Sequence, residues 1–216
     1  MDRSIKMNNK DEHYFKEFSN SAVKFFTVSV SLRRHLYLFK TTTGIFSYKK
    51  LDLGTRVLIE HMIIPKNNKF LLDLGCGYGA IGIVLAYESS ESVVYLTDIS
   101  RRALWCTKQN IKINLPRDND RVSVLYGRYF EPFKSKNIKF DGIYMNPPIR
   151  LGRKQFLNLF RELPIFLNKK GMFQFVLRRK MGAEFVYNYL EDTFSKKQIE
   201  IICKKSGYWV FKYTHE

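Results

Sequence analysis

The chain has 216 residues, of which 45% are hydrophobic and 15% aromatic, and this composition is sufficient for one domain with a substantial core. It excludes a basic disordered tail. The 37 lysines and arginines exceed the 20 acidic residues by 17, which favours a polyanionic partner, most simply nucleic acid. Thermal adaptation would explain the lysines differently, but it usually raises Glu alongside Lys.

The cysteines Cys76, Cys106 and Cys203 are odd in number and far apart, without a C-x-x-C pair. Neither a disulfide framework nor a zinc or other metal site is therefore predicted, and we expect a reducing, intracellular setting such as the cytoplasm. No apolar run approaches the ~20 residues of a membrane span, and the polar start does not resemble a signal peptide.

The first part of the chain is expected to form a small β/α extension, residues 1–65. Residues 23–39 alternate between apolar and polar and are rich in Val, Phe, Leu and Tyr, which predicts short antiparallel strands. Asp52 is a candidate N-cap for a helix over residues 53–64. Because no linker-like stretch follows, this extension should pack on a main domain of residues 66–216.

Strand and helix patterns alternate along the main domain. Strands are predicted at 70–74, 93–97, 122–126, 140–145 and 172–177, helices at 80–87, 101–113, 153–166 with a break near Pro164, and 183–194, and a closing pair of strands at 198–203 and 208–213. This order predicts an α/β fold with a seven-stranded, mostly parallel sheet that ends in an antiparallel hairpin.

A glycine-rich turn, Gly75-Cys76-Gly77-Tyr78-Gly79, follows the strand at 70–74 and precedes a helix. Glycines let a ligand approach the backbone, and a helix N-terminus presents free N–H groups, so this turn is a candidate nucleotide-cofactor site. The spacing is G-x-G-x-G rather than the dinucleotide G-x-G-x-x-G. Asp73, which precedes the turn, would repel a pyrophosphate but favours the cationic S-adenosylmethionine.

Asp98 ends the next predicted strand. At that place an acidic residue can bind both hydroxyls of a ribose, as it does in dinucleotide folds. Its alternative role is to cap the helix that starts near Ser100, and the two roles are compatible.

The segment Asn146-Pro147-Pro148 ends the predicted strand at 140–145, because proline has no N–H to continue a ladder. The prolines hold the Asn146 side-chain oxygen and the Pro147 carbonyl in one geometry. Two fixed acceptors suit an NH2 group, either the exocyclic amine of a nucleobase or a glutamine amide. The alternative is an ordinary loop, since Asn and Pro are common turn residues.

Together these features resemble the class I S-adenosylmethionine-dependent methyltransferases, which have a Rossmann-like fold, and more closely the RsmC-like family that methylates guanine N2 in small-subunit ribosomal RNA. The resemblance rests on motifs spread over nearly the whole chain: His13-Tyr14-Phe15, Thr43-Gly44-Ile45-Phe46-Ser47, Asp52, Gly54-Thr55, Asp73 to Gly79, Asn146 to Arg150 with Gly152, Gly182-Ala183 and Ser206-Gly207-Tyr208.

The resemblance implies a role for each matching residue. The turn from Asp73 to Gly79 would hold the methionine part of the cofactor and Asp98 its ribose, with the target amine at Asn146 and Pro147. The candidate cofactor residues are then Asp73, Gly75, Cys76, Gly77, Gly79, Asp98, Ile99 and Asn146, and the candidate catalytic residues are Asn146, Pro147 and Pro148. From their places in the chain, the candidate substrate residues are Phe46, Ile149, Arg150, Arg153 and Lys154. Many relatives carry a second, inactive methyltransferase-like half, so RNA contacts are expected here from the extension, the basic surface or a partner.

Two positions depart from the family pattern. Arg128 stands where many relatives have Asp or Asn against the adenine, so that contact is expected from the backbone or from Tyr129. Ile149 replaces an aromatic residue that stacks on the target in many amino-methylating relatives, which argues against the glutamine and adenine branches. Phe46 and Tyr48 are the candidates for stacking, with structural packing as their alternative.

The expected reaction is direct methyl transfer to guanine N2 in RNA, with the small-subunit ribosomal RNA or the small subunit as partner. Phosphate contacts are expected from Arg150, Arg153 and Lys154 and further from Arg33-Arg34, Lys49-Lys50 and Arg178-Arg179-Lys180, whose alternative is a solvated basic face. Transfer RNA guanine, a protein glutamine, or a non-catalytic RNA-binding or assembly factor remain alternatives. The intact set of Asp73, Gly75, Gly77, Asp98 and Asn146 speaks against the non-catalytic one.

Overall fold

A computed structural model describes residues 23–65, 69–117, 119–148 and 153–216. The main sheet has seven strands in the order β5-β4-β3-β6-β7-β9-β8, parallel from β5 to β7 and antiparallel from β7 to β8. The predicted α/β architecture with its closing hairpin is therefore confirmed. The strands are β3 (Phe70–Leu74), β4 (Val93–Asp98), β5 (Val122–Tyr126), β6 (Phe140–Met145), β7 (Leu167–Arg178), β8 (Ile199–Lys205) and β9 (Tyr208–Thr214).

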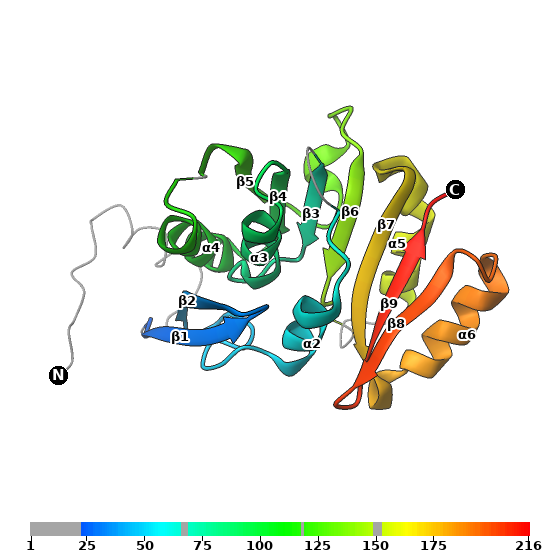
Figure 1. Ribbon diagram of the computed structural model, residues 1–216, viewed down its shortest axis with the longest axis horizontal. Helices are drawn as coiled ribbons and strands as arrows, with labels where there is room; N and C mark the ends of the chain where they lie inside the picture. The colour runs from blue at the N-terminus through cyan, green and yellow to red at the C-terminus, as the bar shows by residue number, and fades with distance from the viewer. Residues whose placement is uncertain (1–22, 66–68, 118, 149–152) are drawn as a thin grey trace.

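Helices cover both faces of this sheet (Figure 1). They are α2 (Leu53–His61), α3 (Ala80–Glu88), α4 (Arg101–Asn114), α5 (Arg153–Phe166) and α6 (Ala183–Thr193). One apolar core joins the sheet to α2, α3 and α4, and a second, rich in phenylalanine, joins it to α5 and α6. None of the described helices is both long and apolar enough to cross a bilayer.

The largest differences from the predicted boundaries are at the end of α2 and the start of β7. Helix α2 ends at His61, before the predicted residue 64. Helix α5 continues through Pro164 to Phe166, and β7 follows at once from Leu167 rather than from residue 172. Because α5 ends two residues beyond Pro164, the proline disturbs only its last turn.

The N-terminal hairpin consists of β1 (Phe25–Leu32) and β2 (His35–Thr42), joined by Arg33 and Arg34. Both arginines have positive φ, at 46° and 66°, as a two-residue hairpin turn requires. The Arg33 guanidinium donates to the carbonyls of Ile59 and Met62 at 3.0 and 3.1 Å, near the end of α2. The structure thus gives Arg33 a structural role, which neither predicted role, a phosphate contact or a solvated basic face, had included.

Two asparagines of α4 hold the edge of β2. Asn110 Oδ1 accepts from the Lys40 N–H at 2.6 Å, and its Nδ2 donates to the carbonyls of Lys40 and Tyr78 at 3.0 and 2.9 Å. Asn114 pairs in the same way with Leu38. Each amide makes the pair of backbone hydrogen bonds that a neighbouring strand would make, and in this way the hairpin packs on α4. The domain boundary at residue 65 stays a prediction.

We predict that Asn110→Ala lowers the free energy of unfolding by about 2–4 kcal/mol, because it leaves the buried carbonyl of Tyr78 and the backbone of Lys40 without partners. Asn114→Ala is the matched control, since its bonds to Leu38 are exposed and water can replace them. It should cost about 1 kcal/mol or less. Urea unfolding measures both, and equal losses would contradict the role assigned to Asn110.

Candidate active site

The glycine-rich turn lies at the carboxyl end of β3, where open α/β sheets bind ligands. The turn glycines Gly75, Gly77 and Gly79 all have positive φ, at 76°, 57° and 90°. A Cβ added at Gly75 or Gly77 would meet no described atom within 4 Å, whereas one at Gly79 would approach Thr107 to 2.9 Å. The first two glycines therefore border open space, and the third is required for packing against α4.

Asp73 is fully buried just before this turn. Its Oδ2 accepts from the Gly82 N–H at 2.8 Å, but its Oδ1 has no hydrogen-bond partner among the described residues. Burial, and to a lesser extent the charge of Asp98, raises the pKa of Asp73 to about 7. A buried, half-satisfied carboxyl group is a site at which a cationic ligand group would be stabilised.

Asp98 ends β4 beside the same turn. Its Oδ2 accepts from the Gly77 N–H and its Oδ1 from the Ser100 N–H, each at 2.8 Å. It therefore holds the glycine turn in place, while Ser100 provides the cap of α4, with its Oγ accepting from the Ala103 N–H. Burial raises the pKa of Asp98. The predicted capping role thus passes to Ser100, and a ribose contact by Asp98 stays a prediction.

The remaining predicted cofactor residues differ in their exposure. Ile99 is 59% exposed directly after Asp98, so it is accessible to a ligand. Cys76 is buried, its Sγ lies 3.8 Å from Thr107 Oγ1, and burial raises the pKa of its thiol well above the ordinary value. Its side chain packs inside the turn, so any contact with a ligand would come from its backbone.

Asn146 lies immediately after β6, and two residues of the extension orient its amide. Its Nδ2 donates to Asp52 Oδ2 at 2.9 Å and to Thr55 Oγ1 at 2.8 Å. A carboxylate can only accept, so the amide must present its NH2 group to Asp52 and its Oδ1 elsewhere. The structure thus leaves the Asn146 oxygen as a fixed acceptor at the carboxyl edge of the sheet.

Asp52 combines this contact with a second role. It is the N-cap of α2, as predicted, and the same Oδ2 accepts from the Thr55 N–H at 2.9 Å. Sequence reasoning identified the cap but missed the contact with Asn146. The Gly54-Thr55 pair after Asp52 was the sequence signal that this turn has a special role. Position 54 requires glycine, because a Cβ there would lie 2.8 Å from the Tyr208 ring.

The two candidates for stacking on the base, Phe46 and Tyr48, differ in how they pack. The Tyr48 ring packs 5.1 Å from that of Phe26 against the core, so its packing alternative applies. Phe46 is 68% exposed in the loop between β2 and α2. Phe46 is therefore the candidate that keeps a free face.

Other predicted residues lie at the limits of the structure. Pro147 is buried and Pro148 exposed. Ile149 and Arg150 lie outside the described residues, and so do the side chains of Arg153 and Lys154 at the start of α5. Arg128 packs over the Tyr129 ring at 5.6 Å, and its backbone N–H donates to Glu131. Within the described ranges no three His, Cys, Asp or Glu side chains form a metal-binding group.

The pKa of Asp73 gives a pH prediction. In the unfolded chain an aspartate titrates near pH 4, whereas in the folded protein its pKa is about 7. Between these values the folded state retains a proton that the unfolded state has lost, so stability falls as pH rises from about 4 to 7. Asp73→Asn should remove this part of the slope in urea unfolding measured against pH. An unchanged slope would contradict the assignment.

Comparisons with known proteins agree with this fold. Residues 36–212 match the methyltransferase small domain family. The chain is 31% identical to the uncharacterized protein YbxB of Bacillus subtilis, over 93% of this chain and 97% of that protein. It is 30% identical to the ribosomal RNA small subunit methyltransferase C of Buchnera aphidicola from Cinara cedri, over 84% of this chain and 52% of the relative.

Among solved structures, a 16S rRNA N2 G1207 methyltransferase (RsmC) of Thermus thermophilus, in complex with AdoMet and guanosine, superposes with a TM-score of 0.72. It is 21% identical to this chain, and the match covers 91% of this chain and 51% of the Thermus protein, so the likeness supports the fold. The chain thus spans about half the length of these ribosomal RNA methyltransferases. From its sequence and its fold, the chain belongs to the methyltransferase small domain family.

Proposed function

We propose that the chain is an S-adenosylmethionine-dependent enzyme that methylates the exocyclic N2 amine of a guanine in RNA, most simply small-subunit ribosomal RNA. The observation that carries the proposal is the orientation of the Asn146 amide, whose Nδ2 is bound by Asp52 and Thr55. Relatives named as ribosomal RNA small subunit methyltransferases support the choice of substrate. Three free cysteines fit a reducing cytoplasm.

The turn after β3 fits the proposed cofactor. Gly75 and Gly77 border open space, and the unpartnered Asp73 Oδ1 is suited to a cationic ligand rather than to a phosphate. Asp98 and the exposed Ile99 would hold the nucleoside part, with the turn around the methionine part. When bound, S-adenosylmethionine supplies an electrophilic methyl group. No metal is proposed to take part.

Asn146 and Pro147 would aim the target nitrogen. The amine of guanine is a weak nucleophile because its lone pair is delocalised into the ring, so alignment matters more than a general base. The Asn146 Oδ1 and the Pro147 carbonyl would each accept one N–H, which directs the lone pair toward the methyl group and stabilises the positive charge that develops on the nitrogen. The nitrogen then loses a proton to water. Alignment of this kind can contribute up to ~7–11 kcal/mol.

Phe46 is proposed to stack on the extruded base, since its ring is the exposed one of the two candidates. Ile149, Arg150, Arg153 and Lys154 remain proposed substrate contacts, because they follow Asn146 directly in the chain. Arginine and lysine at that position would bind phosphates beside the base.

Asn146→Ala should lower the turnover number by about 10²–10³-fold, a loss comparable to that of one positioned hydrogen-bonding group in other enzymes. Cofactor affinity should change little, because the glycine turn and Asp73 stay intact. The assay uses labelled S-adenosylmethionine with small subunits that lack the modification, followed by nucleoside mass analysis, and calorimetry measures cofactor binding.

Formation of N2-methylguanosine by the wild type alone would support both the reaction and the site. A folded Asn146→Ala protein that no longer binds the cofactor would overturn the role given to Asn146. Methylation of transfer RNA or of a protein glutamine, in place of ribosomal RNA, would overturn the choice of ribosomal RNA as the substrate.

A second prediction separates Asn146 from the groups that orient it. Thr55→Val keeps the shape of the side chain but removes the oxygen that accepts from Asn146 Nδ2. Turnover should fall roughly ten- to a hundredfold, because the amide then keeps only its bond to Asp52 and is held less firmly. Thr55→Ser keeps the hydroxyl and is the matched control, expected to retain most of the turnover. Equal losses in the two variants would show that packing, rather than the hydrogen bond, is what Thr55 contributes.

A further inference from the structure

A row of basic side chains crosses the carboxyl end of β7 and the neighbouring hairpin. Arg178 of β7 pairs with Tyr208 of β9, and Tyr208 pairs with Lys205 of β8. Directly opposed residues in antiparallel strands point to the same face of a sheet. Arg178, Tyr208 and Lys205 therefore form one row on one face, with the aromatic ring between two cations.

This row is continuous with the candidate active site. The Tyr208 ring packs on α2, where a Cβ at Gly54 would come within 2.8 Å of it. The same position lies 3.0 Å from Asp52 Oδ2, and that oxygen accepts from Asn146. A ligand that extended from Asn146 across the first turn of α2 would thus reach the row.

A groove of about 370 Å³ opens beside the row, between the β8–β9 turn and the start of α6, and Arg179, Lys204 and Lys205 lie along it. The Arg179 N–H donates to the Gly207 carbonyl at 2.8 Å, which ties the 3₁₀ turn η4 (Arg179–Met181) to the hairpin. Lys204 Nζ lies 3.8 Å from the centre of the Trp209 ring. One backbone hydrogen bond and one cation–ring contact therefore hold the two sides of the groove.

The charge around this groove is strongly unbalanced. Residues 178–180 and 204–205 are all basic and exposed. Glu184 is the acidic residue of the groove lining, and it pairs with Arg179 at 3.0 Å on an exposed surface. Among the described residues, the other four cations have no such ion pair, and they lie next to a site proposed to act on RNA.

We infer that this basic groove, lined by Arg179, Lys204 and Lys205 and flanked by Arg178 and Lys180, binds the phosphate backbone of the RNA strand that flanks the target guanine. The inference rests on the proposed function for the identity of the polyanion. Phosphate contacts fix the register of a protein on a nucleic acid without reading its sequence. The groove would thus deliver the correct stretch of RNA to Asn146, while the base itself is recognised at the active site.

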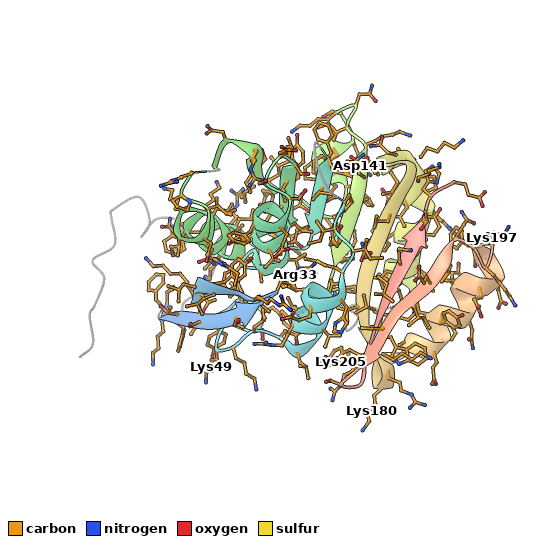
Figure 2. The ribbon with its side chains drawn as sticks, viewed as in Figure 1. Arg33, Lys49, Asp141, Lys180, Lys197 and Lys205 are labelled. Carbon is orange, nitrogen blue, oxygen red and sulfur yellow. The ribbon has the colours of Figure 1, made fainter. Side chains whose placement is uncertain are left out.

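The chain contains its own control for this inference. Lys196 and Lys197 form a second exposed lysine pair, just before β8 begins, whereas Lys204 and Lys205 end that strand. Figure 2 labels one residue of each pair, Lys197 and Lys205, at opposite ends of the hairpin. Lys204→Gln with Lys205→Gln and Lys196→Gln with Lys197→Gln remove the same charge, the first pair at the end of β8 and the second just before its start.

The experiment measures the affinity of each full-length variant for a fluorescein-labelled oligoribonucleotide from the small-subunit RNA, over a titration of salt. The groove pair should bind about five- to thirtyfold more weakly at low salt, and the slope of log K against log salt should fall by about 0.7 for each lost phosphate contact. The control pair should stay near the wild type. Thermal unfolding checks that all three proteins are folded.

Methyl transfer is measured in parallel. For the groove pair, KM for RNA should rise while the turnover number at saturating RNA is kept, which a merely structural defect would not produce. Equal weakening in both pairs, or wild-type RNA binding that does not respond to salt, would overturn the inference. A groove-specific loss of RNA binding in a protein that transfers no methyl group would support the groove and count against the proposed function.

Discussion

The carboxylate of Asp52 is the contact on which the geometry of the candidate site depends. One oxygen, Oδ2, closes the first turn of α2 and also accepts from the amide of Asn146. Since a carboxylate cannot donate, it leaves one orientation for that amide. Helix α2 itself packs on β7 and β9. Residues of the predicted N-terminal extension therefore contribute to the candidate site, because they determine which atom of Asn146 faces the open edge of the sheet.

Beside the glycine turn lie two carboxylates, Asp98 and Asp73, whose oxygens are hydrogen-bonded to different extents. Asp98 gives both of its oxygens to backbone N–H groups, so it is satisfied without a ligand. Asp73 is buried with one oxygen unpartnered and with a raised pKa. Folding thus maintains at Asp73 a group that is unfavourable in the free protein and that a cation would stabilise. The two carboxylates in adjacent strands thus differ, since both oxygens of Asp98 have partners whereas Asp73 has one oxygen with no partner among the described residues.

Some of the basic residues hold parts of the structure together, whereas others are exposed at the surface. Arg33 and Arg121 donate to backbone carbonyls near the ends of α2 and α3, where they satisfy groups that the helices leave open. The exposed cations at the end of the β8–β9 hairpin have a different position, along the same edge as Asn146. A net charge of +17 therefore overstates the surface that is available to a polyanion, and position along the sheet is the better guide.

The sequence by itself determined the features that depend on neighbouring residues. The glycine turn, the strand that stops at Asn146-Pro147, the Asp52 cap and the alternation of strands and helices all follow from local backbone chemistry, and the structure has them where they were predicted. Boundaries moved where tertiary packing decided them, as at the earlier end of α2 and the earlier start of β7. The bond between Asp52 and Asn146 joins residues 94 positions apart, and the row of Arg178, Tyr208 and Lys205 arises from strand register. Only the tertiary structure decided these, because a local pattern carries no information about which distant side chain will lie within hydrogen-bonding distance.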